Sequence, residues 1–228
     1  MEDLNEEVHE FVASANVRTA HSATCHKGEI ARDGPGAPVK CAGVILAGGH
    51  SRRFGRDKAL APFGGAFLIT RSVNALKPAA DILALSGPPA LAAVIDLPPV
   101  GDFPRAPSGP LAGLMGALAW AAAEDCSHVL TAPCDTPFLP ADMAQRLRKA
   151  GETVAVVAAR AERPHPLCAI WRTDQLGHLA RLATDDHPPI RALVDLLGGT
   201  WLDFPSEPDF MNINTKEDFQ IAKARLSR

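Results

Sequence analysis

The chain has 228 residues, of which 46% are hydrophobic, and its formal net charge is −3. This length suits one domain with a tail, or at most two small domains, around a substantial core. The small negative charge argues against broad nucleic-acid binding, and every apolar stretch is shorter than the roughly 20 residues that span a bilayer. Five scattered cysteines fit reduced thiols better than a disulfide framework. We therefore expect a cytoplasmic protein that binds neither nucleic acid nor membranes.

Residues 1–40 differ in composition from the rest of the chain. They hold few large apolar side chains and end in the breaker-rich stretch RDGPGAPVK. Their acidic start, MEDLNEEVHE, lacks the basic-then-apolar order of a secretory signal. We predict a flexible N-terminal extension over residues 1–40, followed by one folded domain over residues 41–228.

Strand-like and helix-like segments alternate after this extension. The predicted strands are short apolar runs, as in strands covered on both faces, and they span 43–47, 81–86, 92–96, 127–132, 153–159 and 167–171. The predicted helices span 67–77, 111–123, 140–150, 173–183, 190–197 and 215–227, and Asp142 and Thr215 stand where capping residues favour a helix start. The alternation predicts a three-layer α/β fold with a mostly parallel sheet flanked by helices. The last two strands, joined by ARAERPHP, are predicted to form a small antiparallel excursion.

The segments that follow the predicted strands are rich in glycine, proline and charged residues. LAGGHSRRFGRDK follows the first strand, SGPP the second, DLPPVGD the third and PCDTP the fourth. Because ligands of an open α/β sheet sit beyond the carboxyl ends of its strands, these segments should meet at one edge. One basic loop facing carboxylates suits a nucleotide with a divalent metal ion.

The first of these loops has the features of a phosphate-binding loop. Gly48 and Gly49 let consecutive backbone N–H groups converge on phosphate oxygens, and Arg53 and Lys58 add positive charge for a triphosphate or a leaving pyrophosphate. The spacing is neither that of a P-loop nor GxGxxG, and a plain exposed basic turn would have the same composition. We expect the Lys58 side chain to be solvent-exposed in the absence of a ligand.

Two aspartates supply negative charge at the same predicted edge. Asp135 directly follows an apolar strand and lies between Pro133 and Pro137, which stiffen the turn. A single carboxylate, completed by phosphate oxygens and waters, is the usual way to hold Mg²⁺. Asp102 lies at the end of a neighbouring predicted strand or just after it. Most aspartates in such loops are caps or turn residues, but two of them at one edge favour a metal–nucleotide site.

Five motifs in order resemble those of one family. LAGG-x-S-x-R-F-G-R-D-K-A-L is followed by SGPLAGLMGAL (108–118), PCDTPFLPADM (133–143), RPHPLCAIW (163–171) and FMNINTKEDF (210–219). Together they resemble the MobA family, the molybdenum cofactor guanylyltransferases, over roughly residues 42–225. The resemblance implies a Rossmann-like nucleotidyltransferase domain that transfers GMP from GTP to the terminal phosphate of molybdopterin with Mg²⁺. The products would be the guanine dinucleotide form of the cofactor and pyrophosphate. Proteins of cofactor synthesis and recipient molybdoenzymes would be its protein partners.

The resemblance also assigns roles to individual positions. It implies that Lys58, Arg53 and Asp135 are catalytic and that Asp135 is the metal ligand. The implied GTP-binding set is Leu46, Ala47, Gly48, Gly49, Lys58, Ser86, Asp102 and Asp135. The implied pterin-side set is Asn212, Asn214, His165 and Arg191. Ser86 is the departure, since the family often has asparagines in this region, and a serine would have to supply the hydrogen bond to the nucleotide.

Two other kinds of function stay open from the sequence. The first is a related nucleotidyltransferase that uses CTP on the pterin, or an NTP on a sugar phosphate. The second is a non-catalytic module that binds a nucleotide or the cofactor. LAGG together with PCDTP favours guanine by resemblance, and the presence of Lys58, Asp102 and Asp135 argues against a decayed site. The attacking phosphate oxygen is already ionised near neutral pH, so the reaction needs no strong general base.

Overall fold

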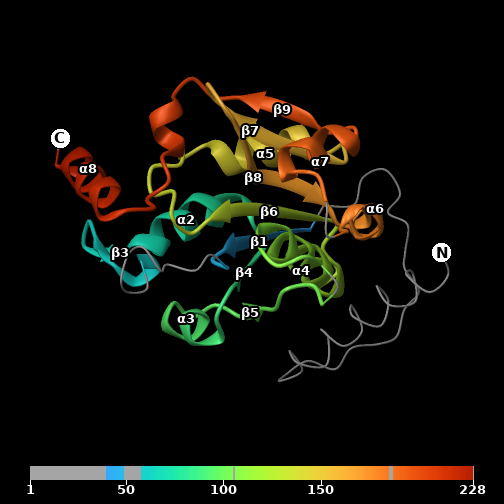
Figure 1. Ribbon diagram of the computed structural model, residues 1–228, viewed down its shortest axis with the longest axis horizontal. Coiled ribbons are helices and arrows are strands. Elements are labelled where there is room, and N and C mark those ends of the chain that lie inside the picture. Colours follow the sequence, from blue (N-terminus) through green and yellow to red (C-terminus); the bar gives the residue numbers. More distant parts are fainter. Residues whose placement is uncertain (1–39, 49–57, 105, 185–186, 228) are drawn as a thin grey trace.

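A seven-stranded sheet organises the fold (Figure 1). The computed structural model describes residues 40–48, 58–104, 106–184 and 187–227, so the predicted extension over residues 1–40 lies, Lys40 apart, outside the described residues. The strand order is β5-β4-β1-β6-β8-β7-β9. The strands are β1 (Cys41–Leu46), β4 (Ile82–Ser86), β5 (Pro99–Val100), β6 (His128–Pro133), β7 (Val156–Arg160), β8 (Pro164–Arg172) and β9 (Thr200–Asp203).

The sheet is mostly parallel, as predicted. β8 is antiparallel to both of its neighbours, β6 and β7, whereas the other described pairs in this sheet are parallel. The predicted antiparallel excursion is therefore confirmed as the β7–β8 hairpin. Because only β8 is reversed, the carboxyl ends of the other strands and the start of β8 lie at the same edge of the sheet.

Helices cover both faces of the sheet and give the predicted three layers. One face carries α4 (Pro110–Ala123), α6 (Leu176–Leu182) and α7 (Ile190–Leu196), and the other carries α2 (Leu68–Leu76), α3 (Pro89–Val94) and α5 (Met143–Gly151). Side chains of β1 alternate between the two cores, since Val44 belongs to the first and Ile45 to the second. In the described part of the chain, no helix has the length and apolar character needed to cross a membrane.

A smaller core lies beyond the edge to which β1 and β6 point (Figure 1). It joins the C-terminal helix α8 (Lys216–Leu226) to the hairpin of β2 (Pro62–Phe63) and β3 (Ala66–Phe67), with Phe63 and Phe219 in contact at 5.8 Å between ring centroids. Thr215 is the N-cap of α8, at the predicted start of this helix, and it forms a reciprocal capping box with Asp218. Asp142 stands at the start of α5, although its side chain makes no capping hydrogen bond.

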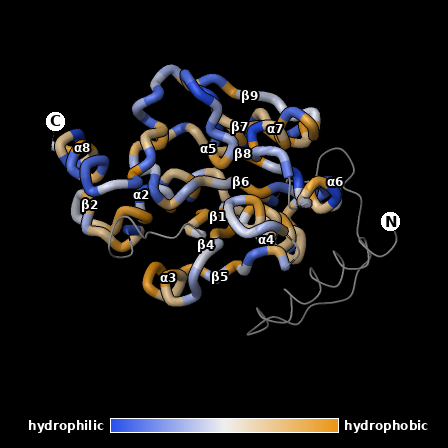
Figure 2. The backbone as a smooth tube through the Cα atoms, viewed as in Figure 1, coloured by the Kyte–Doolittle hydropathy of each residue, from blue (hydrophilic) through white to orange (hydrophobic). Residues whose placement is uncertain are grey.

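One predicted strand is wrong. Residues 92–96 continue α3 and the turn after it, and the third strand of the parallel half is β5 at Pro99–Val100. A short apolar run is equally compatible with a buried helix, and the α3 tube is among the more hydrophobic segments in Figure 2. Pro88 and Pro89 favour a helix over a strand here, because proline is well suited to the first turn of a helix. The hairpin β2–β3 and the strand β9 had no counterpart among the predicted strands.

Candidate active site

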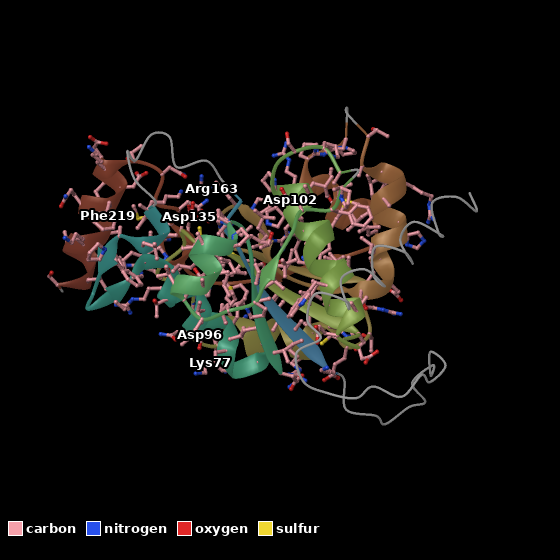
Figure 3. All side chains as sticks on the ribbon, turned by 90° about the horizontal axis from the view of Figure 1, so that it is seen from below. Lys77, Asp96, Asp102, Asp135, Arg163 and Phe219 are labelled. Atoms are coloured by element: carbon pink, nitrogen blue, oxygen red, sulfur yellow. The ribbon has the colours of Figure 1, made fainter. Side chains whose placement is uncertain are left out.

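The edge formed by the carboxyl ends of the parallel strands brings most of the predicted site residues together. Leu46 ends β1, Ser86 ends β4, and Asp102 and Asp135 follow β5 and β6 within two residues. Figure 3 shows Asp102, Asp135 and Arg163 along one side of the molecule, with Lys77 and Asp96 toward the opposite side. The segments that follow these strands therefore lie at one edge of the sheet, as predicted.

The start of the first loop is fixed between the two neighbouring strands. The Ala47 N–H donates to the Ser86 carbonyl at 2.7 Å, and the Leu46 carbonyl accepts from the Cys134 N–H at 3.0 Å. Leu46 and Ala47 are buried, whereas Gly48 is exposed and a Cβ added to it would meet no described atom within 4 Å. Gly49 and Arg53 lie outside the described residues, so their assignment stays a prediction.

Lys58 and Asp135 form an ion pair at the centre of this edge. The Lys58 Nζ lies 2.6 Å from Asp135 Oδ2, and it also donates to the Ile213 carbonyl at 2.9 Å and to Asn214 Oδ1 at 3.3 Å. The side chains of Lys58 and Asp135 are only 12% and 15% exposed. The expectation of an exposed Lys58 is therefore wrong: three oxygens converge on its ammonium and draw it inward, because a largely buried carboxylate needs a partner.

The segment from Met211 to Thr215 packs against this pair. The Ile213 N–H donates to the Asp135 carbonyl at 2.9 Å, so the backbone as well as the Lys58 side chain joins the two loops. Asp218 fixes the next turn: the Asn214 N–H, which donates to its carboxylate at 2.9 Å, is the main reason why the pKa of Asp218 is lowered. Asn214 thus lies at the Lys58–Asp135 pair, and Asn212 is exposed beside it.

Ser86 and Asp102 meet at the first turns of α4. Ser86 is 1% exposed, and its hydroxyl lies 3.5 Å from the Gly113 carbonyl, so it is directed at α4 rather than at open solvent. A Cβ on Gly113 would lie 2.8 Å from Ser86 Oγ and 3.6 Å from Asp102 Oδ1. Asp102 itself is exposed. The absence of a side chain at Gly113 therefore lets Ser86 and the exposed Asp102 approach α4 closely, on the β4–β5 side of Asp135.

A second cluster of charged residues lies on the β7–β8 side of Asp135. The His165 ring stacks on Phe210 with 4.4 Å between centroids, and its Nε2 is 3.1 Å from Glu207 Oε2. Arg163 donates to Glu207 through Nε at 2.9 Å and through its backbone N–H at 3.1 Å. Burial by itself would raise the pKa of Glu207, but the hydrogen bonds from His165 and Arg163 outweigh it and lower that pKa.

Sequence reasoning placed His165 in this region but missed its partners. Glu207 is 42 residues away in the chain and belongs to no spaced motif, so only the fold brings it to His165. Arg163 begins the RPHP motif, which was the one available signal. Arg191 is exposed in the first turn of α7, and among the described residues no hydrogen bond or ion pair joins it to the site.

Comparison with known proteins gives matches over most of the chain. The model of the MobA-like NTP transferase domain matches residues 43–199. A molybdenum cofactor guanylyltransferase of Cereibacter sphaeroides is 39% identical over 189 residues, covering 82% of this chain and 97% of its own. The enzyme of the same name from Rhodobacter capsulatus is 38% identical over 193 residues, with the same coverage of both chains.

Two solved structures show how widely this fold is used. Molybdopterin-guanine dinucleotide biosynthesis protein A from Archaeoglobus fulgidus has a TM-score of 0.65 at 22% identity, and the match covers 82% of this chain and 98% of that one. The 4-diphosphocytidyl-2C-methyl-D-erythritol synthase from Anaerococcus prevotii has a TM-score of 0.64 at 14% identity, covering 83% and 99%. These two likenesses describe the fold, whereas the matched domain and the identity to the curated relatives decide the family. The chain belongs to the MobA-like NTP transferase family.

Proposed function

We propose that this chain transfers GMP from GTP to the terminal phosphate of molybdopterin, giving the guanine dinucleotide form of the cofactor and pyrophosphate. The observation that carries the proposal is the Lys58–Asp135 pair, a cation and a carboxylate held together where the segments that follow β1 and β6 meet. The relatives that share 37–39% identity over most of the chain and are named molybdenum cofactor guanylyltransferase supply the choice of substrates.

The proposed roles divide this edge into a nucleotide half and an acceptor half. Leu46, Ala47, Gly48, Gly49, Ser86 and Asp102 are proposed to bind GTP, and Asn212, Asn214, His165 and Arg191 the pterin. Lys58 and Arg53 are proposed to act on the phosphates between these halves. The exposed Asp102 beside Gly113 supports the first set. Asn214 at the central pair supports the second, whereas Arg191 rests on the sequence alone.

A divalent cation fits the donor set at Asp135. The described residues contain no group of three or more His, Cys, Asp or Glu side chains that could hold a metal ion. A Mg²⁺ ion at Asp135 would therefore take most of its ligands from nucleotide phosphates and water, which is how Mg²⁺ is commonly bound. Such an ion would supply charge neutralisation at the triphosphate. Asp135 Oδ2 is engaged by Lys58, so binding the ion there requires that the lysine change partners.

The residues then serve positioning and electrostatics rather than proton transfer. A phosphate oxygen of the acceptor forms a bond to the α-phosphorus of GTP, and the bond from that phosphorus to the bridging oxygen breaks, releasing pyrophosphate. The nucleophile is already ionised near neutral pH. Lys58 exchanges its carboxylate partner for phosphate oxygens and stabilises the negative charge that develops on them, a contribution of a few kcal/mol for one such contact.

The direct experiment supplies GTP, Mg²⁺ and molybdopterin and measures pyrophosphate and the dinucleotide product. We expect turnover by the natural chain and its loss in Asp135→Ala without loss of the folded state, as judged by circular dichroism. Product from CTP but not from GTP would replace guanylyl by cytidylyl transfer. Binding of both substrates without release of pyrophosphate would identify a binding module.

The setting of the reaction is part of the proposal. We infer one nucleotidyltransferase domain over residues 41–228, preceded by an extension, and a cytoplasmic location with cofactor-synthesis proteins and molybdoenzymes as partners. The described cysteines, Cys41, Cys126, Cys134 and Cys168, are all free thiols, which suits a reducing compartment.

A further inference from the structure

The Arg163–Glu207 cluster, defined as Arg163, His165, Glu207 and Phe210, combines a buried carboxylate with an exposed guanidinium. The Glu207 side chain is 12% exposed, whereas that of Arg163 is 75% exposed. Four donor atoms contact the carboxylate: Arg163 N, Nε and Nη2, and His165 Nε2. Phe210 stacks on the other partner, His165, and limits the motion of that ring. The exposed Arg163 side chain is thus held in place by Glu207, which is itself largely buried.

The hydrogen bonds fix which edge of the guanidinium is free. Nε and Nη2 of Arg163 face Glu207, at 2.9 and 2.7 Å from Oε1. A guanidinium carries five N–H donors in a planar fork, so the Nη1 donors and the second Nη2 hydrogen point away from the carboxylate. Such a fork matches the spacing of two phosphate oxygens. Glu207 offsets part of the positive charge of Arg163, and its hydrogen bonds fix the orientation of the guanidinium.

The fold places this fork on the acceptor side of Asp135. β6 and β8 are antiparallel neighbours, with Thr131 opposite Ala169, so the start of β8 lies beside the end of β6. The chain from Phe210 to Ile213 connects the two features, because Phe210 stacks on His165 and the Ile213 N–H donates to the Asp135 carbonyl. Ser86 and Asp102 belong to β4 and the loop after β5, on the other side of β1.

We propose that Arg163 binds the phosphate monoester of the acceptor substrate and that Glu207 is the residue that positions it. This inference rests on the proposed function, because it takes the acceptor to be a phosphate monoester. The fork would bind two non-attacking oxygens and leave the third free to approach the α-phosphorus. The bound guanidinium would also reduce the repulsion between acceptor and triphosphate, which both carry negative charge.

The test varies molybdopterin at saturating Mg²⁺ and GTP in the natural chain and in Arg163→Gln. We expect the KM for molybdopterin to rise roughly tenfold or more, the loss typical of a hydrogen-bonded charged contact. The kcat and the KM for GTP should stay close to those of the natural chain, and any loss of stability should be small because Glu207 keeps His165 Nε2 and the backbone N–H of residue 163 as partners. Arg163→Lys keeps the charge without the fork, so its acceptor KM should lie between the other two.

Arg160→Gln is the matched control. Arg160 makes the same kind of pair with Asp203, at 2.7 and 3.1 Å, and ends β7 only three residues before Arg163. Its pair lies toward β9, the last strand of the sheet, away from Asp135. We expect Arg160→Gln to leave the acceptor KM unchanged. An equal rise in both variants, or no rise in Arg163→Gln, would overturn the assignment of Arg163.

A double variant tests the positioning role of Glu207. If Glu207 acts through the guanidinium, Glu207→Gln raises the acceptor KM. The double variant, Arg163→Gln with Glu207→Gln, should then have the same acceptor KM as Arg163→Gln alone. Additive effects would overturn the positioning role, because they would mean that Glu207 acts elsewhere.

Binding measured without turnover separates this inference from the proposed reaction. Molybdopterin is titrated onto the protein without nucleotide, and weaker binding by Arg163→Gln supports the inference while equal binding overturns it. A natural chain that binds molybdopterin but forms no dinucleotide product refutes the proposed reaction alone. A natural chain that does not bind molybdopterin refutes both.

Discussion

At the scale of single residues, the central feature is a lysine whose ammonium contacts three oxygen atoms of the protein itself. Lys58 and Asp135 are 12% and 15% exposed, and the ammonium also contacts the Ile213 carbonyl and Asn214. Removing one member of a largely buried pair is costly because the other is left charged and poorly solvated. The same side chain therefore contributes to stability and to the proposed chemistry.

We expect Lys58→Met to lower the free energy of unfolding by about 1–3 kcal/mol. The variant leaves Asp135 without its cation and the Ile213 carbonyl without its donor. Urea denaturation provides the measurement, and Lys77→Met, at an exposed lysine, is the control with an expected change within about 0.5 kcal/mol. Adding Asp135→Asn should recover part of the loss. A Lys58→Met protein as stable as the control would show that the lysine points outward in solution.

Glu207 gives a stability effect whose dependence on pH can be derived. Its pKa is lowered in the folded state, so its ionised form stabilises the fold above the unfolded-state pKa, and this contribution is lost as the pH falls through the lower, folded-state value. We expect the natural chain to be more stable than Glu207→Gln near neutral pH. The difference should shrink as the pH falls below 4.5, the ordinary glutamate value.

Asp203→Asn is the comparison for this pH series. The pKa of Asp203 is also lowered, by the hydrogen bond from Arg160, but both side chains of that pair are exposed and screened by solvent. Chemical denaturation between pH 3 and 7 should therefore give a nearly constant difference for Asp203→Asn. A constant difference for Glu207→Gln as well would contradict the role of the carboxylate.

At the scale of elements, α4 closely approaches the loop after β5, which belongs to the proposed nucleotide half of the site. A Cβ on Gly116 would lie 2.1 Å from the Gly101 carbonyl oxygen, and the Phe103 N–H donates to the Ala112 carbonyl at 3.0 Å. Asp102 lies between these two contacts. The helix is buried along almost its whole length, so it cannot move away without disturbing the core.

We expect Gly116→Ala to be destabilising by about 1–3 kcal/mol, because the added methyl group meets backbone that cannot rotate away. The displaced segment carries Asp102, so the KM for GTP should rise as well. Gly177→Ala in α6 is the control, since its Cβ would meet nothing within 4 Å and alanine favours a helix by up to about 1 kcal/mol. Equal melting temperatures for the two variants would contradict the close approach.

The elements differ in how well the sequence predicts them, for physical reasons. α4 and β6 are long or strongly apolar, and the predicted ranges 111–123 and 127–132 match them within a residue. The predicted strand at residues 92–96 was wrong because a short apolar run has no period that distinguishes a strand from a helix. The two prolines before it favour the start of a helix. β9 pairs with β7 at the end of the sheet. It has only four residues, all at least partly exposed, so its sequence has no apolar run or alternation that would predict a strand.

At the scale of the whole molecule, the strand order brings the residues of the candidate site together at one edge of the sheet. Lys58, Asp135 and Asn214 come from three distant stretches, and each stands in a motif that resembles one of the family's. The contacts among them were not predictable, since the inward direction of Lys58 depends on the Ile213 carbonyl arriving from the far end of the chain. Glu207 was missed for the same reason.

Nucleotide choice can be tested on the whole molecule by thermal unfolding. A ligand that binds only the folded state stabilises it by about 2.7 kcal/mol at a hundred times its Kd. We expect Mg²⁺ with GTP to raise the melting temperature more than the same concentration of Mg²⁺ with CTP, and Asp135→Ala to reduce that rise. Equal protection by the two nucleotides would remove the preference for guanine from the proposal.

The stretch from Glu207 to Asn214 has a thermodynamic consequence. One of its ends holds Arg163 and His165, and the other holds the ammonium of Lys58. Whatever occupies one end and shifts the stretch changes the free energy of occupying the other. Such coupling is reciprocal, so the factor by which the nucleotide alters affinity for the acceptor equals the factor by which the acceptor alters affinity for the nucleotide. If the nucleotide and the acceptor bind as proposed, we therefore expect them to bind as linked ligands, with the stretch from Glu207 to Asn214 connecting the two ends.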